Sequence, residues 1–234
     1  MNDKIVEYSE VEIKLVSDLK INNLSLEINK GEFVFLIGKT GSGKSSILKS
    51  MYADNKIING SANVSDFNLN KIKNKEIPLL RRKIGIIFQD FQLLKDRTVF
   101  KNLEFVLKAT GWKNQKKIND RIKFCLEKVH INDLSTKYPS QLSGGQKQKV
   151  AISRSLLNHP EIIIADEPTG NLDPKSSIEI MNVLQEINEN GNTILIATHD
   201  FSLLKKYKAR ILRCKEGKID EITSQNLDIE AVYE

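Results

Sequence analysis

The sequence is poor in cysteine and arginine, and it has no long apolar run. Its two cysteines, Cys125 and Cys214, are too few for a disulfide framework or a metal cluster, so we interpret both as structural thiols. The strongest apolar runs, Phe33–Ile37 and Ile162–Ala165, are far shorter than the roughly 18 residues that span a bilayer. The first residues lack the pattern of a signal peptide. We therefore expect a cytoplasmic protein that reaches a membrane only through a partner.

The charge is moderately basic, with 36 Lys and Arg against 30 Asp and Glu, a net +6. Only seven of the basic residues are Arg, and the lysines are scattered among acids. Proteins that read nucleic acids favour clustered Arg, so the composition favours a solvated surface and no nucleic-acid partner. Hydrophobic residues make up 40% and charged residues 28%, which is typical of one globular domain with room for an inserted lobe.

Short apolar runs predict the strands of an α/β core. Four such runs are Glu32–Ile37, Ile84–Phe88, Glu161–Ala165 and Thr193–Ala197. Near-continuous apolar runs are typical of parallel strands covered on both faces. The N-terminal stretch Lys4–Ile28 predicts a half-exposed antiparallel sheet, and Arg210–Ile222 predicts a hairpin that turns at Glu216-Gly217.

Helical periodicity dominates the middle of the chain. Apolar residues recur at helical spacing at Val99, Leu103, Val106, Leu107 and Thr110, and again at Ile118, Ile122, Cys125, Leu126 and Val129. No strand pattern separates these helices, which indicates a helical lobe inserted at about residues 92–140. Another helix should begin at Asp173-Pro174, an N-cap followed by proline. Its predicted apolar face is Ile178, Met181, Leu184 and Ile187.

One glycine-rich segment matches the phosphate-binding pattern G-x-x-x-x-G-K-[ST]. Its residues are Gly38, Lys39, Thr40, Gly41, Ser42, Gly43, Lys44 and Ser45. Glycines allow backbone N–H groups to surround a phosphate, Lys44 can reach the β- and γ-phosphates, and the Ser45 hydroxyl can bind Mg²⁺. A flexible Gly/Ser turn is the alternative. The strand before the segment and the helix predicted at Ser46–Met51 favour the phosphate site.

Two carboxylates, Asp166 and Glu167, follow the apolar run Ile162–Ala165. They should lie at the C-terminal edge of a parallel sheet, where ligands of such sheets bind. Asp166 would hold Mg²⁺ through water, and Glu167 would orient or deprotonate the attacking water. Strands often end in Asp or Glu, so this signal gains its weight from the phosphate-binding segment.

A second candidate anion site is formed by Ser143, Gly144, Gly145 and Gln146, ahead of a helix predicted at Lys147–Asn158. A serine and two glycines at a helix N-terminus can bind an anion. A Ser N-cap with a Gly turn is the structural alternative. Because one segment already holds the phosphates, a second site about a hundred residues away suggests a nucleotide shared between two chains.

With these motifs in this order, the chain resembles ATP-binding cassette (ABC) ATPases over nearly its whole length. The string Leu142–Gln146, LSGGQ, resembles the signature of that family. The resemblance implies an α/β P-loop NTPase fold: a RecA-like mixed-sheet core, an N-terminal antiparallel β subdomain and an inserted α-helical subdomain. It places the core at 1–91 and 141–234 and the helical subdomain at 92–140 of a single domain. It also implies Mg²⁺-dependent hydrolysis of ATP to ADP and phosphate.

The same resemblance assigns the remaining site residues. Gln89 resembles the Q-loop glutamine, which senses Mg²⁺ and the γ-phosphate and links the core to the helical lobe; we expect metal binding by Ser45, Gln89 and Asp166. His199 resembles the switch histidine that contacts the γ-phosphate beside catalytic Glu167. Asp173 resembles the D-loop aspartate, which crosses a dimer interface. The resemblance further implies a head-to-tail homodimer in which the signature of one subunit caps the ATP bound to the P-loop of the other.

Two positions depart from the family pattern. Most members have an aromatic residue that stacks on adenine, but the corresponding stretch here is Ile13-Lys14-Leu15-Val16, and Tyr8 lies too early. Loose base discrimination, or a nucleotide-gated scaffold with negligible turnover, therefore stays open. Lys149 stands where Arg is usual after the signature, which keeps the charge and loses the planar fork. We expect this change to tune activity.

Local strings indicate the branch of the family. Asp166–Asp173 resembles the branch of lipoprotein-release, macrolide-export and cell-division ATPases, and Gly31–Gly38 with Leu80–Phe91 is most similar to the FtsE group of cell-division ATPases. This implies an integral membrane partner of the FtsX type, control of cell-wall hydrolases, and a place on the cytoplasmic face of the cell membrane. A lipoprotein-release or macrolide-export ATPase is the alternative, and a soluble ATP-gated nucleic-acid clamp is a further one. Candidate apolar contacts with the partner are Phe91, Leu93, Leu94 and Trp112, unless these side chains pack within the lobe.

Overall fold

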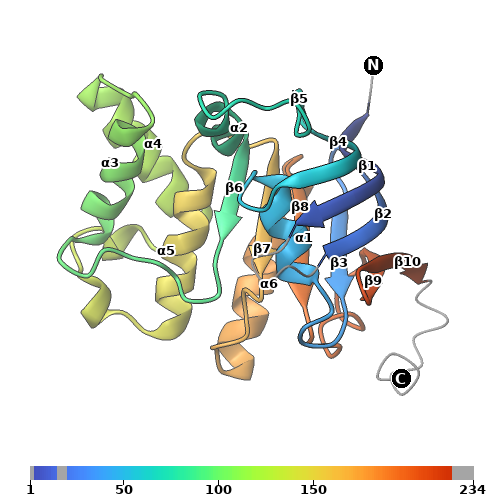
Figure 1. The fold of residues 1–234 in the computed structure, drawn as a ribbon. Coiled ribbons are helices and arrows are strands. Elements are labelled where there is room, and N and C mark those ends of the chain that lie inside the picture. The colour runs from blue at the N-terminus through green and yellow to red at the C-terminus, as the bar shows by residue number, and fades with distance from the viewer. Residues whose placement is uncertain (1–2, 15–19, 223–234) are drawn as a thin grey trace.

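The computed structural model describes residues 3–14 and 20–222, which form two sheets and a helical lobe (Figure 1). The strands are β1 (Lys4–Lys14), β2 (Lys20–Asn29), β3 (Phe33–Ile37), β4 (Ile57–Val64), β5 (Phe67–Asn68), β6 (Ile84–Ile87), β7 (Ile162–Asp166), β8 (Thr193–Thr198), β9 (Arg210–Lys215) and β10 (Lys218–Ile222). The helices are α1 (Lys44–Met51), α2 (Ile77–Lys83), α3 (Val99–Ala109), α4 (Gln115–Lys128), α5 (Gly144–Leu156) and α6 (Pro174–Glu189), with short 3₁₀ turns at Asn132–Leu134 and Pro139–Gln141.

The larger sheet has six strands in the order β10-β9-β3-β8-β7-β6. Every neighbouring pair from β9 to β6 is parallel, and only the β9–β10 hairpin is antiparallel. All four strands predicted from apolar runs are present, and so is the predicted hairpin. Because the strands from β3 to β6 are parallel, their C-terminal ends meet at one edge of the sheet. We call this the sheet edge, and it is where the candidate site lies.

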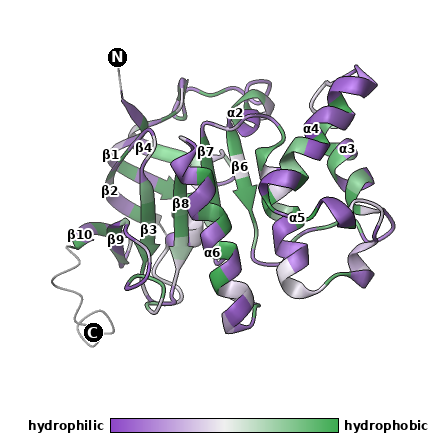
Figure 2. Cartoon of the chain, turned by 180° about the vertical axis from the view of Figure 1, so that it is seen from behind, coloured by the Kyte–Doolittle hydropathy of each residue, from purple (hydrophilic) through white to green (hydrophobic). Residues whose placement is uncertain are grey.

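The smaller sheet is antiparallel, with the order β2-β1-β4-β5. It is the N-terminal antiparallel sheet that the sequence predicts. Figure 1 shows it arched over the face of the larger sheet that carries α1, while Figure 2 shows α6 on the opposite face. The central strands are therefore covered on both sides, which is why they are almost entirely apolar.

Alternate residues of the central strands enter two separate hydrophobic cores, as the period of two along a strand requires. In β7, Ile162 and Ile164 pack with the smaller sheet and α1, whereas Ile163 and Ala165 pack with the helical lobe and α6. Figure 2 shows that the strands of the larger sheet are largely apolar. The central sheet is thus a shared wall between two cores and forms a rigid support for the loops at its edge.

The helical lobe consists of α3 and α4 packed against α5. The predicted apolar positions of α3 and α4 are buried, among them Leu103, Leu107, Ile118 and Ile122. Since α5 also packs on β6, it joins the lobe to the core, and the division at 92–140 stays a prediction. One predicted core position is wrong: Ile178 of α6 is 36% exposed, because it lies near the exposed first turns of α6, beside a surface cavity. Among the described residues no helix is long and apolar enough to cross a membrane.

Candidate functional site

The loop from Gly38 to Ser45 joins β3 to α1, in the strand–loop–helix context that a P-loop needs. Two of its glycines are required by geometry. A Cβ on Gly38 would lie 2.3 Å from the backbone oxygen of Cys214, and Gly43 has φ of 108° where it begins α1. Only glycine combines this close approach with the left-handed conformation. The loop is also held from the side by the β9–β10 hairpin, because Gly217 donates its N–H to the backbone oxygen of Ser42 at 3.2 Å.

Lys44 is buried and points back into its own loop. Its Nζ donates to the backbone oxygens of Gly38 at 2.7 Å and Lys39 at 3.0 Å. Beside it the buried hydroxyl of Ser42 has no hydrogen-bond partner among the described residues. A buried ammonium, an unpaired hydroxyl and the free N–H groups at the start of α1 are the groups that a phosphate accepts from. The loop therefore fits a nucleotide phosphate.

Asp166, at the end of β7, faces the first turn of α1. Its Oδ1 accepts a hydrogen bond from the Ser45 hydroxyl at 3.1 Å. Burial raises the pKa of Asp166 above its ordinary value, and the Ser45 hydrogen bond opposes that rise. A hydroxyl and a carboxylate side by side are oxygen ligands of the kind that Mg²⁺ prefers, so this pair fits a magnesium site.

Glu167 follows in an uncommon conformation, with φ of 51°. A non-glycine residue in this region costs of order 1–3 kcal/mol and is held there by its surroundings. The Glu167 N–H donates to the backbone oxygen of Ala197 in β8, at 2.9 Å. Its carboxylate Oε2 lies 2.6 Å from Nδ1 of His199, which follows the end of β8. The adjacent parallel strands thus bring the predicted base and the predicted switch histidine into direct contact.

Gln89 follows β6, the next strand along the sheet edge. It lines a cavity of about 550 Å³ together with Asp166 and Asn171. The Asn171 amide donates to the backbone oxygen of Gln89 at 3.1 Å. The Gln89 side-chain nitrogen lies 3.2 Å from where a Cβ on Gly170 would stand, so the absence of a side chain there leaves room for the glutamine.

The residues from Ser143 to Gln146 form the first turn of α5. Ser143 is the N-cap and exchanges hydrogen bonds with Gln146: its hydroxyl accepts from the Gln146 N–H at 3.2 Å, and its own N–H donates to the Gln146 side chain at 2.9 Å. This capping box confirms a Ser-capped helix start. The α5 helix begins three residues earlier than predicted, at Gly144 rather than Lys147. The structural and the anion-binding interpretations of this motif are compatible.

The signature glycines pack against the segment 171–176 of their own chain. A Cβ on Gly144 would lie 3.1 Å from Leu172, and one on Gly145 would lie 3.1 Å from the Ser176 hydroxyl. Asp173 caps α6 by accepting from the N–H of Ser176 at 3.0 Å and from its hydroxyl at 2.6 Å. These hydrogen bonds lower the pKa of Asp173. In Figure 1 the start of α5 lies beyond β6, whereas α1 and the P-loop lie on the other side of β7.

A family model described as ABC transporter matches residues 21–170. The chain belongs to the ABC transporter family. The cell division ATP-binding protein FtsE of Bacillus subtilis is 43% identical over 199 residues, which is 85% of this chain and 87% of that protein. The FtsE proteins of Streptococcus pneumoniae (strain D39) and Escherichia coli (strain K12) are 41% and 39% identical over 199 residues, 85% of this chain and 86% and 89% of those proteins.

Solved ABC cassettes share the fold. The dimeric post-hydrolysis state of the ATP-binding cassette MJ0796, bound to ADP and phosphate, is 33% identical with a TM-score of 0.80, over 93% of this chain and 98% of that one. CbiO1 of Clostridium perfringens is 30% identical with a TM-score of 0.87, over 99% of this chain and 93% of that one. These relatives confirm the predicted ABC ATPase fold. This ABC protein is an ATP-binding, ATP-hydrolysing subunit of the FtsE type.

The fold thus brings together most of the predicted site of this ABC ATPase. Ser45 contacts Asp166, Glu167 contacts His199, and Gln89 shares a cavity with Asp166. Of the other P-loop residues, Lys39, Thr40 and Gly41 are exposed and Ser46 is partly buried in α1. The signature residues and Asp173 form a second group, joined to each other through the start of α6. The individual roles of all these residues stay predictions.

The two departures from the ABC pattern have distinct structural settings. Tyr8 is buried and its hydroxyl lies 3.0 Å from that of Ser50, so it is not available to stack on a base. Of the stretch without an aromatic, Ile13 is buried and Lys14 is exposed, and Leu15 and Val16 lie outside the described residues. Lys149 has a partner: its Nζ lies 3.1 Å from Glu179 of α6, which keeps the signature helix tied to the core.

Sequence reasoning missed three polar side chains that hold the loops of this ABC site. Ser176 packs under Gly145 and binds Asp173, Asn171 binds the backbone at Gln89, and Arg154 of α5 binds the backbone two and three residues farther on. Asn171 and Ser176 lie within three residues of Asp173, and this closeness to a predicted site residue could have identified both. The only signal for Arg154 is that it is a rare arginine on a helix whose other face is apolar.

Proposed function

We propose that this protein is the motor of an FtsE–FtsX-like complex. It sits on the cytoplasmic face of the cell membrane, binds ATP with Mg²⁺, and couples ATP-driven dimerisation to an integral membrane partner that controls cell-wall hydrolases. One observation carries the chemistry: a single sheet edge gathers Lys44, the Ser45–Asp166 pair and the Glu167–His199 pair. The proposed role in cell division is supported by the relatives, which are named cell division ATP-binding protein FtsE.

The P-loop residues bind and orient the nucleotide phosphates. Lys44 exchanges its backbone acceptors at Gly38 and Lys39 for phosphate oxygens, which keeps the ammonium paired throughout. Ser45 and Asp166 would hold Mg²⁺ through their oxygens, and the ion would supply neutralisation of the phosphate charge. Because these groups are already held at one sheet edge by contacts within the chain, catalysis rests on positioning and preorganised charge.

Glu167 accepts a proton from the attacking water. Its contact with Nδ1 of His199 fixes the direction of the carboxylate, and leaves the other ring nitrogen of His199 to face the γ-phosphate. Gln89, across the cavity that it shares with Asp166, reports the presence of the phosphate and ion to the segment that leads into the helical lobe. A general base of this kind contributes about 10²–10⁴-fold to the rate.

A homodimer completes the site. The signature turn presents the start of α5, where N–H groups and the Ser143 hydroxyl favour an anion. Within the chain, its two glycines pack on segment 171–176. Two copies arranged head to tail place each signature on the nucleotide of the other. The dimeric state of the MJ0796 cassette relatives supports this arrangement.

The membrane partner docks in a groove between core and helical lobe. A cavity of about 490 Å³ lies there, lined by α2, by α3, by the end of α5 and by the segment after β6. Its lining includes apolar Val106 and Ala109 and basic Arg81 and Arg82. Of the four contacts predicted from sequence, Leu93 and Trp112 pack against the hydrophobic core shared by the lobe and the sheet. Phe91 is partly buried and Leu94 is exposed. The groove stays the proposed docking site, and Leu93 and Trp112 are no longer proposed as contacts because they pack within the chain.

Capture of the partner tests the proposal. The Glu167→Gln variant, tagged and trapped with ATP, is pulled from solubilised membranes, and the proteins that come with it are identified. Wild-type protein with ADP is the control. A small permease-like protein with one large extracytoplasmic loop, together with cell-wall hydrolases, is the expected result.

Two other results would overturn the proposed role in cell division but would not affect the proposed ATP hydrolysis. A lipoprotein-release or export permease would show the transporter alternative, which uses the same catalytic residues. Recovery only from the soluble fraction, with salt-sensitive binding of DNA or RNA, would show the nucleic-acid clamp.

A further inference from the structure

Arg154, on α5, binds the backbone of the segment that follows Gln89. Its guanidinium donates to the carbonyl oxygen of Phe91 at 3.0 Å and, through its other terminal nitrogen, to that of Gln92. The two carbonyls are consecutive, and the planar fork of arginine suits such a pair because both donors point the same way. The contact joins the helix that begins with the signature to the loop that begins with Gln89.

The backbone that Arg154 holds is in an unfavourable conformation. Phe91 and Gln92 both have positive φ, 60° and 47°, although neither is glycine. The Gln92 N–H closes the turn by donating to the Asp90 oxygen at 2.7 Å. Consecutive non-glycine residues in the left-handed region persist only where the surroundings enforce them. The two bonds from Arg154 are such an enforcement.

The other end of the same loop is held from a different element. Asn171 donates its side-chain amide to the carbonyl oxygen of Gln89 at 3.1 Å. Asn171 precedes Asp173, so it belongs to the segment on which the signature glycines pack. Two side chains thus hold the backbone of residues 89–92 at its two ends: Arg154 from α5 and Asn171 from the segment before α6.

We propose that Arg154 and Asn171 are positioning residues that set where the Gln89 side chain points. Through them, the position of the loop at residues 89–92 depends on the positions of α5 and of segment 171–176. This inference rests on the role proposed for Gln89 above. A displacement of α5 or of segment 171–176 moves the backbone of residues 89–92 through these three hydrogen bonds. Both side chains act through Gln89 and need not touch the nucleotide.

The test compares variants of Arg154 and Asn171 by steady-state ATP hydrolysis. Arg154→Gln removes the fork, and we expect kcat to fall by about tenfold with KM for ATP changed less than about twofold, because misplacement of a catalytic group acts on the chemical step. Arg154→Lys, which keeps one donor and the charge, should recover part of the loss. Asn171→Ala should also lower kcat, and because Asn171 is exposed, we expect the variant to fold as the wild type does.

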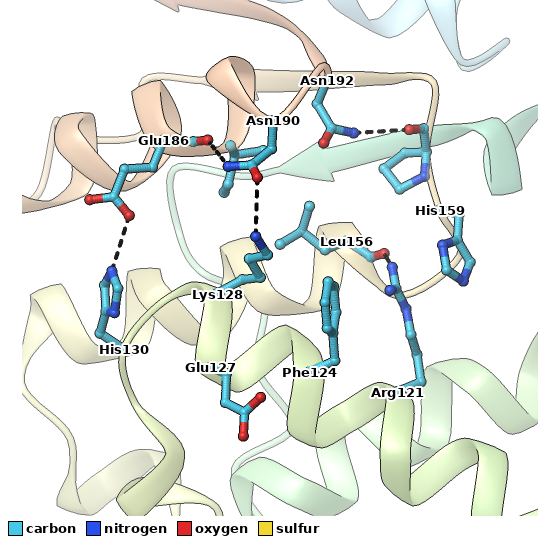
Figure 3. Close-up of a pocket in the computed structure, with 12 residues that line it drawn as sticks. Arg121, Phe124, Glu127, Lys128, His130, Leu156, His159, Glu186, Asn190 and Asn192 are labelled. Atoms are coloured by element: carbon cyan, nitrogen blue, oxygen red, sulfur yellow. Dashed lines mark hydrogen bonds and ion pairs between the residues drawn. The ribbon is translucent and has the colours of Figure 1, made fainter.

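Arg121 supplies the matched control. This arginine of α4 also donates to two consecutive backbone carbonyls, those of Leu156 and Leu157 at the end of α5. Figure 3 shows Arg121 reaching the carbonyl of Leu156. Arg121 therefore makes the same kind of two-carbonyl contact as Arg154 and also involves α5, but it does not bind the loop that follows Gln89. Arg121→Gln should weaken the lobe as much as Arg154→Gln, while kcat stays within about twofold of wild type because no site loop is released.

Hydrogen exchange gives a readout that does not depend on activity. Backbone amides of residues 90–94 should exchange about tenfold faster in Arg154→Gln than in wild type, while those of β6 keep their protection. Equal exchange in the two proteins, or equal acceleration in Arg121→Gln, would overturn the inference.

A double-variant cycle separates this inference from the proposed function. If Arg154 acts through Gln89, Arg154→Gln should add little to the loss already caused by Gln89→Ala. Multiplicative losses would overturn the positioning role and leave Gln89 in place. Wild-type turnover by Gln89→Ala would instead overturn the proposed role of Gln89 itself.

Discussion

The sheet edge and the start of α5 are both candidate phosphate-binding regions, but their side chains differ in the contacts that they make within the chain. At the sheet edge, Lys44, Asp166 and Glu167 each have a partner within the chain. At the start of α5, Ser143 and Gln146 cap each other, and the glycines rest on segment 171–176. The first region is held together by contacts within one chain, whereas the second is the surface that we propose a second copy completes.

This difference teaches where the activity is controlled. A site complete in one chain would hydrolyse ATP at all times. In the proposed homodimer the site is divided between two copies, so hydrolysis would depend on dimer closure, and a partner that favours or opposes closure would set the rate. The following variants affect one region and leave the other intact.

The largest effect should come from Glu167→Gln at the sheet edge. Loss of the general base should lower the rate of ATP hydrolysis by at least about 100-fold, while ATP still binds and the dimer accumulates. Phosphate release and light scattering measure the two properties. Glu161→Gln is the control, because Glu161 pairs with Lys83 away from the edge, and it should hydrolyse ATP normally. Turnover by Glu167→Gln at the wild-type rate would remove Glu167 from its role.

Lys44→Ala should weaken ATP binding itself. Hydrogen bonds to charged groups contribute about 1.5–3 kcal/mol, so the dissociation constant should rise roughly 10- to 100-fold. Titration with a fluorescent ATP analogue measures it. The exposed Lys56, which follows α1 closely, gives a control variant, Lys56→Ala, with unchanged affinity. Unchanged affinity in Lys44→Ala would contradict the phosphate role of the P-loop.

Ser143→Ala changes the second region, the start of α5, and leaves the sheet edge intact. We expect ATP to bind each monomer as in wild type, while ATP-driven dimerisation weakens by roughly tenfold through the loss of one hydrogen bond to a charged group. The cap itself is worth about 1 kcal/mol of stability. Thr98→Ala, which removes the equivalent cap of α3, controls for that loss and should dimerise normally. If Ser143→Ala lowered monomer affinity instead, the signature would belong to the site of its own chain.

The smallest effects should appear in stability, with opposite signs at two aspartates. The pKa of Asp166 is raised above its ordinary 3.8, so the native state binds more protons near that pH and stability falls as the pH rises through the window above 3.8. Asp166→Asn removes this cost and should raise Tm at pH 7 by at most about 2–4 °C, with no gain at pH 3.

Asp173 gives the opposite case. Its pKa is lowered from 3.8 by hydrogen bonds from Ser176, so it contributes stability above 3.8 that is lost as the pH falls below that value. Asp173→Asn should therefore lower Tm at pH 7 and change it less at pH 3. Thermal unfolding of both variants over pH 3–7 measures the two signs, and equal signs would contradict the assignment.

Much of the fold could be predicted because its strands are covered on both faces. Such strands are apolar at every position, as in Ile162–Ala165, and are visible without neighbours. β4 and α2 carry no such signal. β4 includes Asn59, Gly60 and Ser61 and is a strand because it pairs with β1, while α2 is only seven residues long. Ile178 has helical spacing and yet is exposed, since periodicity fixes a face of a helix and not the point where the helix leaves the core.

The sequence by itself determined the chemistry of this protein, because the P-loop, the paired carboxylates and the signature are short segments whose function follows from local backbone and residue type. Only the tertiary structure decided how those segments communicate. Arg154 and the carbonyls of Phe91 and Gln92 are about sixty residues apart, 63 and 62, and Asn171 lies 82 residues from Gln89. Such pairs leave no periodic trace in the sequence, since they meet only when α5 packs on β6 and β7 lies beside it.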